Sequence, residues 1–216
     1  MIQLDKVSKK YAGKLVINQI SCQVDRGILH IRGENGSGKT TLLNMMAGSL
    51  VPDKGQILYS TSDLYDKKNS KIKKTIGYIP DIAPIYPFLS GNDLLQFICK
   101  IKKSEWPSDL IEILNLERHL GTNFTSMSYG TKKKFLFVSG MISNPHYLIL
   151  DEPMNGLDEH ATSEMYRLLT KHLDSDNGIC VIVSHDLSWI DKWRDSYNYY
   201  PLTLGGTRPH YCDPVP

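Results

Sequence analysis

GENGSGKT, at residues 33–40, is the stretch that decides how this sequence folds. It matches the pattern G-x-x-x-x-G-K-[ST], whose glycines allow a sharp turn that points backbone N–H groups inward at phosphate oxygens. The apolar run GILHIRG (27–33) before it predicts a buried strand, and TTLLNMMAG (40–48) after it predicts a helix. Because a phosphate-binding loop needs this strand–loop–helix context, the stretch indicates a nucleotide-binding α/β protein.

Each part of this loop has a chemical task toward a nucleotide and its Mg²⁺ ion. The Lys39 ammonium is expected to reach the β- and γ-phosphates, and the Thr40 hydroxyl is expected to ligate Mg²⁺. The helix that begins near Thr40 offers its positive end to the same phosphates. The loop residues that we predict to bind the nucleotide are Gly33, Asn35, Gly36, Ser37, Gly38, Lys39, Thr40 and Thr41.

A second acidic stretch, YLILDEP (147–153), places Asp151 and Glu152 at the end of an apolar strand. Ending a buried strand in two acids costs free energy, so the pair indicates that the carboxylates have a function. Asp151 is suited to hold Mg²⁺ through water, which completes a metal site with Thr40. Glu152 can polarise a water that attacks the γ-phosphate, so we predict it as the general base.

Strand and helix patterns alternate along the rest of the chain, which predicts an α/β fold with a parallel sheet. Further strands are expected at 56–59, 75–80, 147–152 and 179–185, and further helices at 91–103, 108–119, 130–143 and 159–172. The part at 82–143 is nearly all helical and is predicted to be an inserted helical subdomain. The tail at 197–216 has no clear periodicity, and the sequence does not place it.

His185 follows the last predicted strand, in VIVSHD. A histidine by itself is more often a structural residue than a catalytic one. Ligands of open α/β sheets, however, bind at the carboxyl ends of the strands. The position of His185 therefore predicts a role at the phosphate site.

The composition is that of an ordinary globular protein. Of the 216 residues, 41% are hydrophobic and 22% are charged, and the net charge of +2 is too small to favour bulk binding of nucleic acid or an acidic membrane. No stretch reaches the roughly 18 apolar residues of a membrane span, so any membrane role is expected to go through a partner. The cysteines form no CxxC pair and are expected to be reduced thiols in a cytosolic protein: Cys22, Cys99, Cys180 and Cys212.

Taken in this order, the motifs resemble the nucleotide-binding subunit of ATP-binding-cassette (ABC) proteins over residues 1 to about 195. The resemblance rests on GENGSGKTT, MSYGTKKK (127–134), YLILDEP, NGLD (155–158) and VSHD together. It implies a P-loop NTPase core with a parallel sheet, a small antiparallel β subdomain and the inserted helical subdomain. The chain 1–216 would then be a single nucleotide-binding domain with an atypical C-terminal tail, and its cofactors would be ATP and Mg²⁺.

The resemblance also implies roles for residues outside the loop. Two subunits of this family pair head to tail, and the signature of one faces the γ-phosphate held by the other. Ser128 and Gly130 would therefore contact a partner's ATP, aided by a helix N-terminus. Tyr11 would stack on adenine, and Asp158 would lie in the loop that joins the two sites. His185 would hold the γ-phosphate and the attacking water.

The sequence departs from the family pattern near these sites. Tyr129 replaces the first glycine of the usual LSGGQ signature, and Thr131 replaces its glutamine. Asp81 stands where the family commonly has a glutamine that contacts Mg²⁺ and the attacking water; its side chain is shorter but still offers Mg²⁺ an oxygen. The lysines at 132–134 are interpreted as a solvated helical face. A cassette that binds ATP but hydrolyses it poorly, as a regulatory module, therefore stays an alternative.

The leading interpretation is the ATP-binding and ATP-hydrolysing subunit of an ABC transporter. It would work with integral membrane permease subunits and a second nucleotide-binding subunit, identical or different, and without nucleic acid. It would be cytoplasmic and peripheral on the inner face of the membrane. Export is favoured over import, because an acid after GY-x-P is familiar among subunits that serve separate membrane proteins, many of them exporters, and no extra C-terminal regulatory domain is present.

Two further alternatives come from other classes. A soluble ABC ATPase acting on ribosomes or DNA usually carries two cassettes or a long coiled-coil insertion, and this sequence has neither. A small-molecule kinase with a phosphate loop would fit the length, but it would leave the MSYG stretch and the DEP strand end unexplained.

Overall fold

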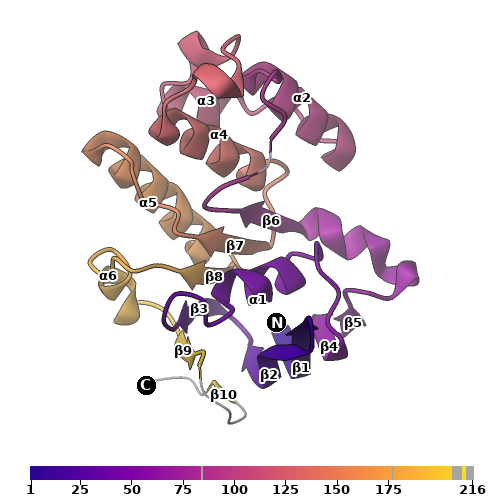
Figure 1. The fold of residues 1–216 in the computed structure, drawn as a ribbon. Helices are drawn as coiled ribbons and strands as arrows, with labels where there is room; N and C mark the ends of the chain where they lie inside the picture. Colours follow the sequence, from indigo (N-terminus) through magenta and orange to yellow (C-terminus); the bar gives the residue numbers. More distant parts are fainter. Residues whose placement is uncertain (84, 177, 206–210, 213–216) are drawn as a thin grey trace.

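A five-stranded parallel sheet carries the loop that follows β3 (Figure 1). The computed structural model describes residues 1–83, 85–176, 178–205 and 211–212. The strand order is β6–β7–β8–β3–β9, and every neighbouring pair is parallel. The predicted α/β fold with a parallel sheet is thus confirmed. Its strands are β3 (Gly27–Arg32), β6 (Ile76–Ile79), β7 (Tyr147–Asp151), β8 (Ile179–Val183) and β9 (Tyr199–Thr203).

Side chains of the parallel sheet face two separate hydrophobic cores, because successive residues of a strand point to opposite faces. In β7, Ile149 faces the core shared with the second sheet, whereas Leu148 and Leu150 face the core on the other side. In β8, Val181 and Ile182 divide in the same way. A sheet covered on both faces reads as unbroken apolar runs, which is why the sequence revealed these strands.

The second sheet is mostly antiparallel, in the order β10–β2–β1–β4–β5, and it confirms the small antiparallel subdomain. Its strands are β1 (Ile2–Tyr11), β2 (Lys14–Val24), β4 (Lys54–Tyr59), β5 (Ser62–Asp63) and β10 (Tyr211–Cys212). β1 and β2 form a hairpin that the strand patterns did not identify. Register shifts interrupt β1 between Leu4 and Val7 and again before Lys9, and such bulges break the period-two pattern.

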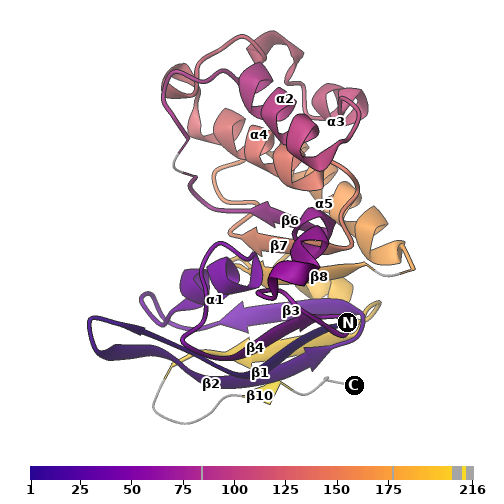
Figure 2. The ribbon, with the colours of Figure 1, turned by 90° about the vertical axis from the view of Figure 1, so that its right-hand side faces the viewer.

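The helix α1 (Lys39–Met46) packs between the two sheets, so the loop before it opens at the carboxyl edge of the parallel sheet (Figure 1). α2 (Gly91–Lys102), α3 (Ser108–Ile113) and α4 (Tyr129–Met141) connect β6 to β7, with short 3-10 turns η2 (Glu117–His119) and η3 (Phe124–Ser126). Figure 2 shows these three helices together at the top, beyond β6 and β7. The other helical segments are η1 (Lys67–Thr75), α5 (Glu159–Asp174) and α6 (Asp191–Arg194).

One predicted helix is shorter than expected. The segment at 108–119 was expected to be continuous, but α3 ends at Ile113. Asn115 adopts a positive φ of 54°, which no α-helix can continue through, and the chain re-enters a 3-10 turn at Glu117.

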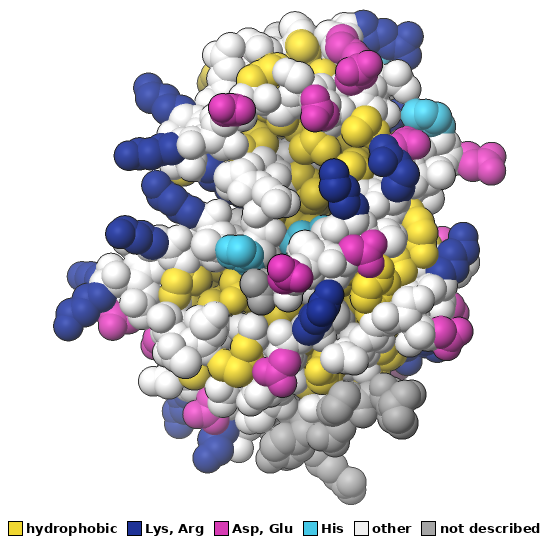
Figure 3. All heavy atoms as spheres, turned by 180° about the vertical axis from the view of Figure 1, so that it is seen from behind, with side chains coloured by type: hydrophobic (Ala, Val, Ile, Leu, Met, Phe, Trp, Pro, Cys, Tyr) yellow, Lys and Arg dark blue, Asp and Glu magenta, His cyan; other side chains and the backbone are white. Residues whose placement is uncertain are grey.

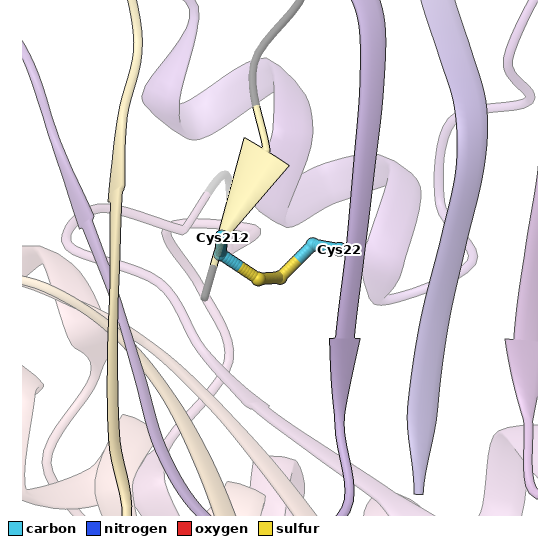
Figure 4. Close-up of a disulfide and its surroundings, with 2 residues drawn as sticks. All are labelled: Cys22 and Cys212. Atoms are coloured by element: carbon cyan, nitrogen blue, oxygen red, sulfur yellow. A yellow bond between two sulfur atoms is a disulfide. The ribbon is translucent and has the colours of Figure 1, made fainter. Parts of the chain in front are cut away.

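Two of the cysteines correct the expectation of four reduced thiols. Cys22 on β2 and Cys212 on β10 form a disulfide, with their Cα atoms 5.0 Å apart (Figure 4). The two strands pair in parallel and set these residues opposite each other. Because 190 residues separate them in the sequence, no local spacing could reveal the pair.

The tail left unplaced by the sequence supplies an edge strand to each sheet. β9 pairs with β3, and β10 pairs with β2. The predicted tail at 197–216 includes 206–210 and 213–216, which lie outside the described residues.

The surface carries its charge unevenly. In Figure 3, Lys and Arg side chains gather along the left edge, the side on which η1 lies in that view. The sequence of η1, KKNSKIKKT, holds five lysines.

Within the described part of the chain, no helix combines the length and apolarity that crossing a membrane requires.

Candidate nucleotide-binding site

The loop between β3 and α1 curls around the ammonium group of Lys39. Lys39 Nζ donates hydrogen bonds to the carbonyls of Gly33 at 2.7 Å and Glu34 at 3.0 Å. Gly38, which precedes α1, adopts a φ of 99° that only glycine takes without strain. A Cβ atom on Gly33 would lie 2.5 Å from Ser37 Oγ. The glycines thus permit a backbone path that holds the ammonium beside the positive end of α1.

Thr40 and Asp151, which are both predicted to bind Mg²⁺, are in contact. Thr40 Oγ1, in the first turn of α1, donates to Asp151 Oδ2 at 2.9 Å, at the end of β7. Burial raises the pKa of Asp151, and the hydrogen bond from Thr40 opposes that rise. A hydroxyl and a carboxylate are the hard oxygen donors that Mg²⁺ prefers, and Mg²⁺ usually takes one or two carboxylates besides substrate phosphates. These residues therefore fit Mg²⁺.

Glu152 and His185 lie side by side next to that pair. The backbone N–H of His185 donates to Glu152 Oε2 at 3.2 Å, and His185 Nε2 lies 3.6 Å from Glu152 Oε1. Oε1 is buried and has no hydrogen-bond partner among the described residues. Burial raises the pKa of Glu152, and the bond from the His185 amide lowers it. A carboxylate with a raised pKa and an unused acceptor atom is suited to accept a proton from water.

A cleft of about 1530 Å³ brings most of the predicted site residues together. It exceeds the roughly 300–1,000 Å³ of sites for small ligands, so a nucleoside triphosphate has room in it. Tyr11, at the end of β1, is 47% exposed at this cleft. The predicted residues that line it are Tyr11, Asn35, Gly36, Gly38, Lys39, Thr40, Thr41, Asp81, Asp151, Glu152 and His185. Gly33 and Ser37 belong to the same loop but do not line the cleft.

Ser128, Gly130 and Asp158 do not line this cleft. Ser128 caps α4, because its Oγ accepts a hydrogen bond from the Thr131 N–H at 3.1 Å. Asp158 caps α5 in the same way through the Ala161 N–H at 2.7 Å, and it pairs with Lys134 at 3.2 Å. The signature residues therefore form the exposed start of a helix outside the chain's own cleft.

Sequence reasoning missed Lys133. Its side chain is only 1% exposed, so the interpretation of the three lysines as a solvated face is wrong at this position. Lys133 Nζ donates to Asp81 Oδ1 at 2.9 Å and to the Glu152 carbonyl at 2.5 Å. Helical spacing could not have singled it out, because Lys132, Lys133 and Lys134 each stand three and four residues before buried apolar side chains within 135–138.

Comparison with known proteins agrees with this geometry. The family model described as "ABC transporter" matches residues 17–155. The bacitracin transport ATP-binding protein of Enterococcus faecalis is 30% identical over 201 residues, which cover 90% of this chain and 64% of that protein. The zinc import ATP-binding protein of Pseudomonas fluorescens is 30% identical over 198 residues, which cover 90% of this chain and 71% of that protein. The chain thus spans less than two thirds of the length of the first relative.

Solved structures show the same fold. An ATP-binding cassette in a dimeric post-hydrolysis state, bound to ADP and Pi, superposes with a TM-score of 0.78 at 22% identity and 94% coverage of both chains. The ATP-binding subunit of an ABC transporter superposes with a TM-score of 0.81 at 23% identity, covering 94% of this chain and 85% of that one.

Proposed function

The chain belongs to the ABC transporter family, and from that premise we propose that it is the ATP-binding and ATP-hydrolysing subunit of a transporter. One observation carries the proposal: a single cleft holds the Lys39 ammonium, the Thr40–Asp151 contact and the Glu152–His185 pair. These are a phosphate cation, a set of metal ligands and a general base, which together are the parts that ATP hydrolysis requires.

Each of these residues has a place in the proposed reaction. Lys39 and the amides of the loop bind the phosphates, and Thr40 and Asp151 hold Mg²⁺. When bound, Mg²⁺ neutralises charge that develops on the β- and γ-phosphate oxygens. Glu152 accepts the proton of the attacking water, and His185 holds Glu152 and the γ-phosphate in position relative to each other.

The proposal assigns two more groups to the nucleotide. Tyr11 offers an exposed ring at the edge of the cleft for stacking on adenine. Asp81 would be a third ligand for Mg²⁺, through the oxygen that Tyr129 and Lys133 do not use, since both of those donate to Oδ1.

A second nucleotide-binding subunit completes the site. Ser128 and Gly130 stand at the exposed N-terminus of α4, outside the chain's own cleft, where they can face the γ-phosphate held by a partner. Asp158, at the start of α5, would lie in the loop that joins the two sites. The dimeric cassette bound to ADP and Pi supports this arrangement.

Dimerisation should depend on ATP. Glu152→Gln with Mg·ATP should double its molar mass in light scattering, because uncleaved ATP can bridge Lys39 of one chain and Ser128 of the other. Without nucleotide, or with ADP, the same variant should stay monomeric. A monomer with ATP that pairs only after a different cassette is added would identify a heterodimer, and a monomer under both conditions would contradict the head-to-tail pairing.

We also propose membrane permease subunits as partners, which places the chain in the cytoplasm against the inner face of the membrane. The loop between β6 and α2 supports this. Ile82, Tyr86 and Phe88 are 75%, 67% and 69% exposed, and the rings of Tyr86 and Phe88 stack with centroids 5.6 Å apart. Exposed apolar groups gathered on one loop are typical of a protein contact. Export is the proposed direction, because Asp81 after GY-x-P resembles subunits that serve exporters.

A cysteine at Tyr86 should crosslink to a co-expressed membrane subunit. The variant Tyr86→Cys is made in a Cys99→Ser background, because Cys99 is the partly exposed free thiol among the described residues. Val51→Cys is the matched control, since Val51 is 58% exposed and follows α1, outside the proposed contact. Crosslinks confined to partners within the chain, or equal for the two variants, would contradict the assignment of this loop.

A further inference from the structure

We propose that Lys133 is a positioning residue for ATP hydrolysis, which holds Glu152 and Asp81 in place and ties both to the helix that begins at Ser128. The proposal rests on the proposed function and deepens it, because neither the motifs nor the family comparison assigns a role to this lysine.

Burial of the Lys133 ammonium requires partners, since an unpaired charge in a protein interior is strongly unfavourable. At 1% exposure its Nζ bonds Asp81 Oδ1, the Glu152 carbonyl and, at 3.4 Å, the Asp151 carbonyl. All three partners belong to residues predicted to hold Mg²⁺ or to activate water. A lysine that served only to fill space would not need to reach the end of β7.

The backbone of Glu152 is held in an uncommon conformation at this contact. Its φ is 46°, in the left-handed region that is strained for a non-glycine residue. The Glu152 N–H donates to the Val183 carbonyl at 2.9 Å, and the Glu152 carbonyl accepts from Lys133. Together with the Asn155 N–H, which donates to the same Glu152 carbonyl at 3.2 Å, these bonds fix the peptide on both sides of the residue. The turned backbone lets the carboxylate reach the His185 amide.

Two of the departures from the family pattern, Tyr129 and Asp81, meet at the same ammonium. Tyr129 Oη donates to Asp81 Oδ1 at 2.6 Å, and Lys133 Nζ lies 5.9 Å from the centroid of the Tyr129 ring. The ring also covers Gly156, where a Cβ atom would lie 2.5 Å from it. The tyrosine in place of glycine and the aspartate in place of glutamine are therefore bonded to each other, with Lys133 between them and the catalytic strand.

This arrangement connects the two nucleotides of a dimer. Ser128 starts α4, and Lys133 follows it five residues later on the same helix. An α-helix moves as a rigid rod over such a distance, so a partner's γ-phosphate that shifts Ser128 also shifts the Lys133 ammonium. We infer that this movement changes the direction in which the Glu152 carboxylate points. Hydrolysis in one site would then depend on the contact that the same chain makes with its partner's nucleotide.

The test compares Lys133→Met with Lys132→Met. Lys132 lies one residue earlier on the same helix, is partly exposed and has no ion pair among the described residues. Lys133→Met should lower kcat on the order of 10–100-fold, as expected when a group that orients a reacting residue is lost, and leave Mg·ATP affinity unchanged. Lys132→Met should match wild type in both, and Lys133→Arg should recover part of the rate.

A second comparison separates positioning from general damage. In an Asp81→Asn, Glu152→Gln background, single-turnover hydrolysis should not fall further when Lys133→Met is added, because both groups that the lysine positions are already altered. A further fall, or a loss of nucleotide affinity, would mean a merely structural role. If Lys133→Met does not fold, Asp81→Asn keeps the lysine and should lower kcat, by less, with affinity preserved.

The outcomes also separate this inference from the proposed function. Equal rates for Lys133→Met, Lys132→Met and wild type, with Glu152→Gln inactive, would overturn the positioning role alone. Equal rates for wild type and Glu152→Gln would overturn the proposed hydrolysis itself.

Discussion

Glu152→Gln is expected to bind Mg·ATP with wild-type affinity and to hydrolyse it about 10²–10⁴-fold more slowly, the range that general-base catalysis contributes. Glutamine keeps the shape of the side chain but cannot accept the proton of the attacking water. The groups proposed to bind phosphate, Lys39 and the loop amides, are separate from Glu152 and stay intact. The measurement is steady-state hydrolysis, with nucleotide affinity determined by calorimetry in parallel.

Two further variants test whether this loss of turnover comes from the catalytic role of Glu152. Glu159→Gln makes the same chemical change at an exposed position in the first turn of α5 and should leave turnover unchanged. His185→Ala should also slow turnover, because it removes the imidazole that lies 3.6 Å from Glu152 Oε1. If wild type hydrolyses ATP no faster than Glu152→Gln, even with membrane subunits present, the chain is an ATP-binding regulatory module instead.

The elements that the sequence predicted best are those whose pattern is set by burial on both faces. β7 and β8 are apolar runs up to their last residues, and β3 is one apart from His30 and Arg32, because their apolar side chains meet one of the two cores. The hairpin of β1 and β2 could not be read in the same way. One face of an antiparallel sheet can remain in water, and the bulges near Val7 shift which residues point to that face.

The residues of the candidate site also differ in how far the sequence could predict them. Lys39, Thr40 and Glu152 were predictable because the chemistry of phosphate and metal binding fixes residue types at short spacings. Contacts between distant residues carry no such signal. Lys133 meets Asp81 across 52 residues, and Cys22 meets Cys212 across 190. Lys133 counts as polar in any hydrophobic pattern, and its two neighbouring lysines have the same spacing from the buried residues of α4.

The hydrogen bonds around Lys133 also change the interpretation of Tyr129 and Asp81, two residues that depart from the family pattern. Taken one at a time, Tyr129 and Asp81 suggest a weakened hydrolysis site. In the structure they share a hydrogen bond and a buried cation, so each has a partner that a glycine or a neutral side chain would not provide. Hydrolysis by this chain is therefore expected to depend on the pair as a unit, and single replacements toward the family pattern should not improve it.

Lys39→Ala is expected to lower Mg·ATP affinity by about 10²-fold or more, since charge-assisted bonds to phosphate are the strongest contacts the cleft can make. Among the described residues that line the cleft, Lys39 is the only lysine or arginine, so no other side chain of that kind can replace its charge. The affinity is measured by calorimetry with Mg·ATP and the variant at equal concentrations of salt.

The same ammonium also organises the loop, which requires a control for indirect effects. Lys39 Nζ holds the carbonyls of Gly33 and Glu34, so alanine could loosen the loop as well as remove its charge. Lys73→Ala removes a lysine whose Nζ donates to the Gly48 carbonyl at 3.1 Å outside the cleft, and it should bind Mg·ATP as wild type does. Lys39→Arg retains the charge and should recover part of the affinity if electrostatics dominates. Equal affinity of Lys39→Ala and wild type would remove the phosphate-loop assignment, because a loop that binds phosphates cannot lose its cation without losing affinity.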